Sequence, residues 1–297
     1  MTNLINPEDI LATTSETSEV LGHLFWFSIG KQMNKMDDLK QKLIDSGVGE
    51  AWLPNPIRAV DAFRKATTEI QTRKPTADPK IYKNVLIREV FSNKDMIQRN
   101  IVVETVNQND RTLGYDTKTG VIRLDKKNSS LFFEASDPGV VELCEEAEKK
   151  FYLYRDHYSS QHIRVMVTKI LNSLAPTPMR EQGVIYFVPI SMKQRLTDLV
   201  TLIRTLENSD AFMVPVIDTN DNRYMVEKKL ADHLDSLLEQ CRNTAGLRKD
   251  QVKMLVNNTN RAIKDFKKYK ELIDSEKDFF QKRIIHLLSE VMKLIQE

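Results

Sequence analysis

Residues 82–135 read YKNVLIREVFSNKDMIQRNIVVETVNQNDRTLGYDTKTGVIRLDKKNSSLFFEA. Five runs in this stretch are rich in β-branched and aromatic residues, and Asn, Asp, Gly, Ser and Lys fill the short links between them. The runs are 85–91, 97–106, 112–115, 121–124 and 131–133. Because links this short join antiparallel neighbours, the stretch predicts a central antiparallel β-meander.

The segment before the meander is predicted to be mostly helical. Asn6-Pro7 has the residues of a helix start, and 24–29 (LFWFSI) is a compact apolar run that predicts a buried strand. Helices are predicted over 36–44 and 57–71 from their apolar period of three to four residues. The two prolines in 74–80 then indicate a connector.

A long helix is predicted after the meander, over 137–174. Asp137-Pro138 opens it, with the acid as cap and the proline in the first turn. The polar patch 159–161 is expected to bend or break this helix.

The second half of the chain has the outline of a βαβ unit. Residues 175–178 (APTP) form a linker, and an apolar strand follows at 184–188. The Ser-x-x-Gln spacing at 191–194 is that of a capping box and opens a helix, and 212–217 is the next strand. The two strands are expected to be parallel neighbours joined by a right-handed crossover, before a helix over 222–243.

The last fifty residues place an apolar side chain at every third or fourth position, which predicts helical, coiled-coil-like arms that need a partner surface. The arms are expected to form a hairpin or one long rod. Packing on the chain's own core and association with another chain remain as alternatives. The residues expected to contact a partner are Phe266, Tyr269, Ile273, Phe280, Leu287 and Leu294.

The sequence therefore predicts an α+β protein divided into 1–174, 175–246 and 247–297. With 41% hydrophobic and 29% charged residues it has the composition of a folded protein. No run approaches the roughly 18 apolar residues of a membrane span, and the start of the chain lacks the features of a secretory signal. Cys144 and Cys241 are far apart in apolar surroundings, so we expect buried free thiols and a cytoplasmic protein.

The motifs of the common enzyme classes are absent from the sequence, so no catalytic residue, metal ion or cofactor is expected. Among nine glycines there is no phosphate-binding loop and no serine nucleophile elbow. His157 and His162 lie about 140° apart around a helix, which is the wrong spacing for metal ligands. A metal-dependent hydrolase remains an alternative, built on Glu104, Asp116 and Lys118, although a solvated sheet face explains the same residues.

A second alternative is a nucleic-acid-binding protein that holds single-stranded DNA in replication or recombination. Residues 56–127 carry 15 Lys and Arg against 9 Asp and Glu, with Tyr82, Phe91 and Tyr115 among them. The cations that would contact nucleic acid are Arg58, Arg64, Lys65, Arg88, Arg99 and Arg123.

Two short segments, 56–64 (PIRAVDAFR) and 184–189 (VIYFVP), resemble a family of uncharacterised proteins from bacteria and their phages. The resemblance brings no known activity and implies a phage or mobile-element context. With the helical arms, it leads us to expect a non-catalytic, homo-oligomeric interaction protein directed at a host component.

Overall fold

The computed structural model describes residues 19–107, 109, 112–180, 184–269, 272 and 277–296. The helix start predicted at Asn6 and the contact residue Ile273 lie outside the described residues. The chain divides into two compact units. Unit 1 comprises Met1–Gln32, Lys40–Leu53 and Ile163–Glu297, and unit 2 comprises Met33–Leu39 and Pro54–His162, so the chain passes between the units more than once.

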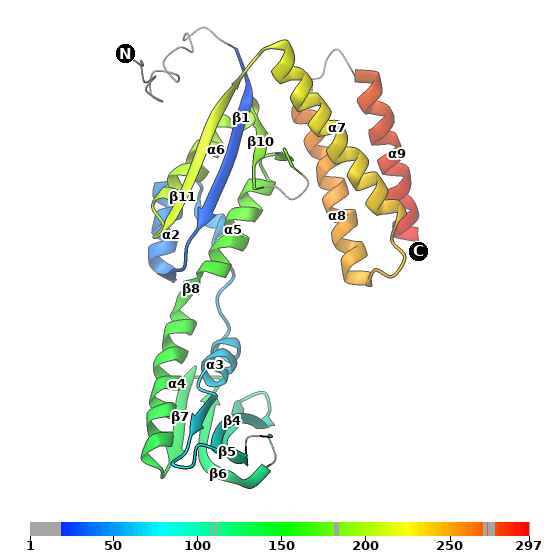
Figure 1. The fold of residues 1–297 in the computed structure, drawn as a ribbon. Helices are drawn as coiled ribbons and strands as arrows, with labels where there is room; N and C mark the ends of the chain where they lie inside the picture. Colours follow the sequence, from blue (N-terminus) through cyan, green and yellow to red (C-terminus); the bar gives the residue numbers. More distant parts are fainter. Residues whose placement is uncertain are drawn as a thin grey trace, which may run out of the picture. The chain divides into compact units, whose positions relative to one another are not determined.

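Unit 2 contains the predicted meander, which is confirmed (Figure 1). Its five antiparallel strands follow one another in the order β3 (Thr72–Pro75), β4 (Ile81–Ser92), β5 (Met96–Asn107), β6 (Thr112–Asp125) and β7 (Ser130–Ala135).

The strands differ from prediction in two places. The segments 112–115 and 121–124 belong to one strand, β6, because an irregularity in its pairing with β5, between Ile101 and Val103, absorbs the turn-like residues between them. In addition, β3 falls partly in the predicted connector 74–80, where Pro75 is tolerated because β3 lies at the edge of the sheet.

Two helices, α3 (Ala59–Thr68) and α4 (Pro138–Asp156), pack on one face of this sheet. Their buried residues, which include Phe63 and Phe151, form one core with the inward-facing residues of β4 to β7, which include Ile101. At the start of α4 the Asp137 carboxylate accepts hydrogen bonds from the backbone N–H groups of Gly139 and Val140, as its position before a proline predicts.

The long helix predicted over 137–174 is broken near its polar patch. The chain leaves α4 in an extended conformation, forms β8 (His157–Ser159) against β2 (Met33–Lys35), and continues as α5 (Ser160–Asn172). Tyr158 holds the break in place, since its side chain is buried and its hydroxyl donates a hydrogen bond to the Pro54 carbonyl at 2.7 Å.

Unit 1 contains a four-stranded sheet in the order β11-β1-β10-β9. Its strands are β1 (Val20–Ile29), β9 (Thr177–Pro178), β10 (Tyr186–Pro189) and β11 (Ser209–Ile217), and α6 (Lys193–Arg204) connects β10 to β11. Because β1 runs antiparallel to both β10 and β11, those two strands are parallel, and the βαβ-like second half is confirmed.

The two parallel strands are not neighbours, which corrects the prediction, since β1 lies between them. Strand β1 approaches β10 closely, since a Cβ atom built on Gly22 of β1 would lie 2.3 Å from the Val188 carbonyl oxygen of β10. The predicted capping box is also wrong, because Ser191 lies in a short 3₁₀ turn (Ile190–Met192) and makes no cap to α6.

The C-terminal helices of unit 1 are α7 (Asn220–Arg242), α8 (Lys249–Phe266) and α9 (Lys277–Gln296), with a 3₁₀ turn (Lys267–Tyr269) after α8. Figure 1 shows them side by side, so the predicted arms fold back as a bundle with α7 and do not form a rod. We call this group the helical bundle. Two further short elements are α2 (Met36–Asp45) and a 3₁₀ turn at Glu50–Trp52. No described helix combines the length and the apolar character needed to cross a membrane.

Candidate functional site

The predicted apolar stripe forms the interior of the helical bundle. Tyr269, Phe280 and Leu287 are buried in one core with apolar residues of α7, and Phe266 is partly buried against the same core. Leu294 packs at the edge of a smaller cluster around Cys241 and Val291. The chain's own helices therefore cover these side chains, and of the six expected contact residues only Ile273 lies outside the described part.

Polar contacts fix the bundle around this interior. The Arg283 guanidinium on α9 forms two hydrogen bonds with the Asp235 carboxylate on α7, at 2.8 and 2.9 Å. The Tyr269 hydroxyl donates to the Ala175 carbonyl oxygen at 2.7 Å. Helical period identified the apolar side of α8 and α9 correctly, but a period alone does not distinguish the chain's own core from a partner.

A second apolar row on α9 faces away from this interior. It consists of Ile285, Leu288, Met292 and Ile295, whose exposed fractions are 61%, 44%, 58% and 61%. Their spacing of three, four and three residues keeps them on one side of the helix. We call this row the α9 stripe.

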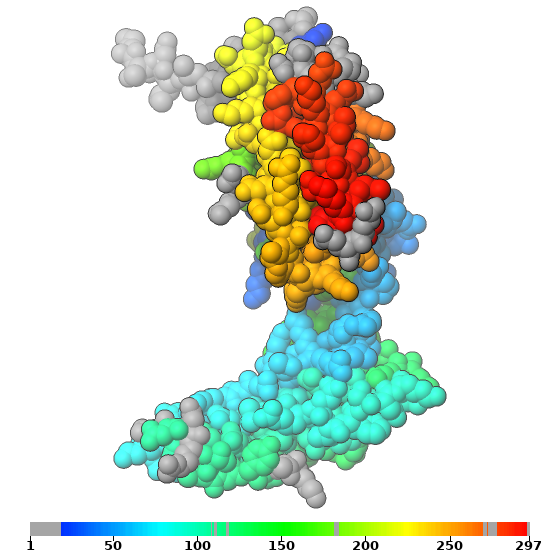
Figure 2. All heavy atoms as spheres, turned by 90° about the vertical axis from the view of Figure 1, so that its right-hand side faces the viewer, coloured from blue at the N-terminus to red at the C-terminus, as the bar shows by residue number. Residues whose placement is uncertain are grey.

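Figure 2 shows α9 lying along the surface of the bundle, with α7 beside it. A groove of about 550 Å³ lies next to the end of the stripe, and Ile295 belongs to both. Its apolar lining comes from Leu247, Val252, Val256 and Leu294, and the rest from Thr244, Lys249 and Lys253. The stripe and the groove thus form continuous apolar surface at this end of the bundle.

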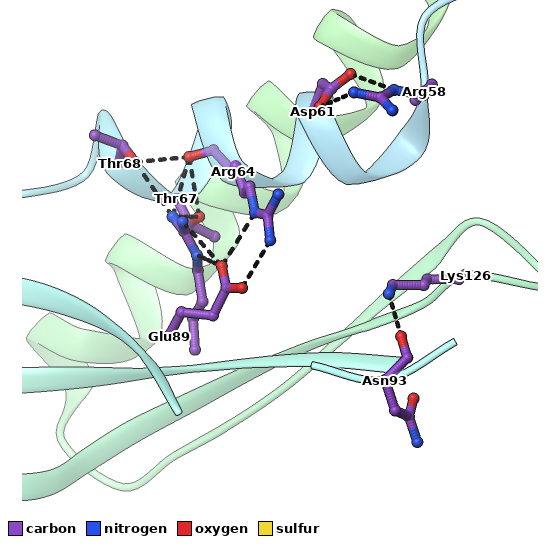
Figure 3. Close-up of polar contacts among 9 residues, drawn as sticks. Arg58, Asp61, Arg64, Thr67, Thr68, Glu89, Asn93 and Lys126 are labelled. Atoms are coloured by element: carbon purple, nitrogen blue, oxygen red, sulfur yellow. Dashed lines mark hydrogen bonds and ion pairs between the residues drawn. The ribbon is translucent and has the colours of Figure 1, made fainter. Parts of the chain in front are cut away.

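Three of the cations proposed to bind nucleic acid lie on α3 or on the face of the unit 2 sheet that α3 covers, and Figure 3 shows Arg64 with its partner Glu89. The Arg64 guanidinium bonds both carboxylate oxygens of Glu89, at 2.7 and 3.1 Å. Arg99, largely buried, bonds the same carboxylate at 3.3 Å and the Thr67 hydroxyl at 2.8 Å. Lys65 lies 3.9 Å from the centre of the Tyr154 ring.

These arginines join α3 to strands β4 and β5. The hydrogen bond from Arg64 is the main cause that holds the pKa of Glu89 below its ordinary value, and Arg99 adds to it. Because both guanidinium groups bond the same carboxylate within the fold, Arg64 and Arg99 serve the packing of unit 2. Arg58 is likewise paired, with Asp61 at 2.7 Å on the exposed start of α3.

The remaining two cations, Arg88 and Arg123, lie on the opposite, outer face of the sheet. Arg123 bonds Glu134 at 2.6 Å and Gln98 at 3.0 Å. Arg88 is exposed, and within the described part of the chain it has no hydrogen bond or ion pair. The six cations therefore do not converge on one surface.

One row across the outer face does combine aromatic rings with a cation. Phe91 pairs with Gln98, Gln98 with Arg123, and Arg123 with Phe132, so these four side chains stand side by side on four strands. Both phenylalanines are exposed. We call this the Phe91–Phe132 row; sequence reasoning named Phe91 and Arg123 but missed Phe132, which the register brings to them.

Of the residues considered for a hydrolase, Glu104 and Asp116 lie on opposite faces of the sheet, and the Lys118 side chain lies outside the described part of the chain. Glu104 and Val103 are consecutive on β5 and point to opposite faces, and Asp116 pairs with Val103 while Tyr115 pairs with Glu104. The Glu104 carboxylate accepts hydrogen bonds from Thr112 and Asn84. Among the described residues, no three His, Cys, Asp or Glu side chains gather as metal ligands would.

The cysteines are free and buried, as expected. Burial raises the pKa of the Cys144 thiol to about 11. Since the thiolate is the reactive form, this cysteine is not suited to act as a nucleophile at neutral pH.

The chain belongs to DUF6744, a family of unknown function, whose model matches residues 20–297. No curated protein and no solved structure matches the chain. The resemblance to a family without a known activity is thereby confirmed.

Proposed function

We propose that this protein is a non-catalytic interaction protein that self-associates through the α9 stripe, with the same stripe of a second copy as its partner. The supporting observation is the exposure of four large apolar side chains at heptad-like spacing on one helix. Two-fold pairing of a stripe with itself is geometrically simple, because each copy presents the same knobs and holes.

The chemistry around the stripe fits a self-pairing surface. The neighbouring exposed positions Gln281 and Ser289 are uncharged, and Lys282, three residues before Ile285, adds one charge at the N-terminal end of the stripe. The arm's association was expected from the sequence, but the side of the helix that we assign to it is a different one from the buried stripe.

The energetic scale supports a reversible dimer. Full burial of a Leu, Ile or Met side chain contributes about 1.5–3 kcal/mol, and roughly half of that is still to be gained at each stripe position. Eight side chains from two copies then supply roughly 6–12 kcal/mol, against an association cost of about 4–15 kcal/mol. The stripe therefore supports a concentration-dependent dimer, strengthened if the adjacent groove is also covered.

Sedimentation equilibrium of the whole chain tests this proposal. We expect a mass that rises from monomer to dimer over the micromolar range, and a monomer at the same concentrations for Met292→Glu. Met254→Glu is the matched control, because Met254 is equally exposed on α8 and lies outside the stripe. A wild-type chain that stays monomeric, or a Met254→Glu variant that dissociates as fully as Met292→Glu, refutes the assignment.

The setting that we propose is a phage- or mobile-element-borne protein acting on a host component in the cytoplasm. The resemblance of 56–64 and 184–189 supports the first part, and two buried free thiols support a reducing compartment. Capture of a host protein by wild-type chain and by Met292→Glu, followed by mass spectrometry, tests whether a host component binds at all and whether it needs the stripe.

The Phe91–Phe132 row favours a second candidate function, binding of single-stranded nucleic acid. Two exposed rings flanking a guanidinium offer stacking surfaces for bases, and each stacked base contributes about 1–3 kcal/mol. We expect Phe91→Ala/Phe132→Ala to abolish retention of labelled single-stranded DNA at low salt if this function is correct. Charge reversal at Arg64 is a poor test, because it breaks the pair with Glu89 and disturbs the fold.

A further inference from the structure

A cavity in unit 1, lined by both apolar and polar side chains, is separate from the α9 stripe. It has a volume of about 280 Å³ and lies between α7, α8, the segment around Pro176 and strand β10. Its polar lining includes Tyr186, His233, Asn258, Arg261 and Asp265. We call it the α7–α8 cavity.

The base of the cavity is held by hydrogen bonds within the fold. The Tyr269 hydroxyl is buried, donates to the Ala175 carbonyl oxygen and lies 2.7 Å from the Thr177 hydroxyl. The Lys268 ammonium, next in the chain, bonds the Ser173 carbonyl at 3.3 Å. These contacts tie the end of α8 to the segment before β10, so the cavity is formed before any ligand arrives.

The α8 wall of the cavity carries three polar side chains beside the apolar Ala262 and Phe266. Asn258, Arg261 and Asp265 are three and four residues apart and line the cavity from one side of α8, and His233 lines it from α7. Little of their hydrogen-bonding capacity is used inside the fold. Arg261 makes one long bond, at 3.4 Å, to the Asn258 side-chain oxygen, and His233 has no bond to any described residue.

The charges in the cavity favour a negative ligand. The Asp265 carboxylate is matched by the Lys268 ammonium at 3.4 Å. Arg261 has no carboxylate partner among the described residues, so its guanidinium is the unmatched charge at the mouth of the cavity. Burial, and next the charge of Arg261, lower the pKa of His233, so the imidazole is neutral at pH 7 and offers one donor and one acceptor.

We propose that the α7–α8 cavity binds a small metabolite through an oxyanion, a phosphate or a carboxylate, held by Arg261 and hydrogen-bonded by His233 and Asn258. The planar guanidinium matches the geometry of both groups. The cavity volume equals about nine water molecules at the liquid share of about 30 Å³ each, so it admits the oxyanion together with a small organic body. It is at the lower limit of ligand pockets, which excludes a large cofactor.

The test is an NMR titration of the histidine ring protons of the full chain, with inorganic phosphate in one arm and malonate in the other. The His233 resonance is identified by its absence in His233→Asn. We expect it to shift and saturate at millimolar concentrations of at least one anion, while sodium chloride at matched ionic strength leaves it in place. The anion whose binding curve saturates, phosphate or malonate, identifies the ligand group as a phosphate or a carboxylate.

Variants of two arginines complete the test. Arg261→Gln should lower the affinity for the saturating anion at least tenfold. Because Arg261 is exposed, the variant should remain folded, which a thermal unfolding curve will verify. Arg242→Gln, on an exposed arginine of α7 away from the cavity lining, should bind like wild type. A His233 resonance that neither anion moves, or equal affinity of Arg261→Gln and wild type, overturns the proposal.

Discussion

Two single substitutions on α9 distinguish a side chain that stabilises the interior of the bundle from one that belongs to its proposed contact surface. Leu287 is fully buried, while Ile285, two positions earlier on α9, is 61% exposed. Leu287→Ala removes three buried carbon groups and leaves a cavity, which costs about 2–5 kcal/mol of the free energy of unfolding. Ile285→Ala removes the same number of groups from an exposed position and should change that free energy by less than about 0.5 kcal/mol.

For the free energy of dimer formation we expect the opposite order, with the larger loss for Ile285→Ala. At about 0.8 kcal/mol per buried CH₂ group, and with about 60% of Ile285 available for burial, truncation removes roughly 1.5 kcal/mol per copy. A two-fold dimer contains the residue twice, so it loses roughly 3 kcal/mol. The dissociation constant should therefore rise about a hundredfold.

Urea denaturation at a protein concentration low enough for the chain to be monomeric measures the first quantity, and sedimentation equilibrium measures the second. Each variant serves as the control for the other, because both shorten α9 side chains by the same amount. The reasoning is refuted if Ile285→Ala lowers the urea midpoint as much as Leu287→Ala, or if only Leu287→Ala weakens the dimer.

Three further predictions concern single residues. Glu89 has a pKa below the ordinary 4.5, so the stability that it contributes is complete above pH 4.5 and is lost as the pH falls through the lower value of the folded state. Glu89→Gln should therefore reduce the acid dependence of the urea midpoint between pH 5 and pH 3, and an unchanged slope would contradict this. Gly22→Ala should unfold unit 1 or leave it insoluble, because the added Cβ meets a main-chain oxygen of β10, whereas Gly114→Ala, whose Cβ would come no closer than 3.9 Å to Thr105, should shift the thermal midpoint by only a few degrees in either direction. The Cys144 thiol should resist a disulfide reagent at pH 8 in the native protein and react within seconds in denaturant; rapid native labelling would show that the thiol is accessible.

The strands of unit 2 and the helices of the bundle follow from local sequence. Strand geometry imposes the alternation of side chains along 82–135, and helix geometry imposes the three-to-four-residue period along 247–297. Each pattern can be recognised from a short stretch of neighbouring residues. The break at His157–Ser159 was also foreseen from its polar patch, although the buried Tyr158 that fixes it was not.

The candidate surfaces depend on residues that meet only in three dimensions. Arg64 and Arg99 looked like free cations in a basic segment, yet both bond the Glu89 carboxylate, 25 and 10 positions away, between α3 and the sheet. Phe132 reached Arg123 only through the register of β6 and β7. The charge and composition of a segment give the number of such residues, but they do not show which side chains these residues contact.

Sequence by itself determined most of the strands and helices of this protein, with β3 and β8 as exceptions, because the backbone geometry of each element leaves its period in neighbouring side chains. Tertiary structure decided that β1 separates β10 from β11, and that α9 turns Leu287 inward and Ile285 outward. Both apolar rows of α9 carry the same helical period. Only the packing of α7 and α8 against one of them determines which row stays exposed.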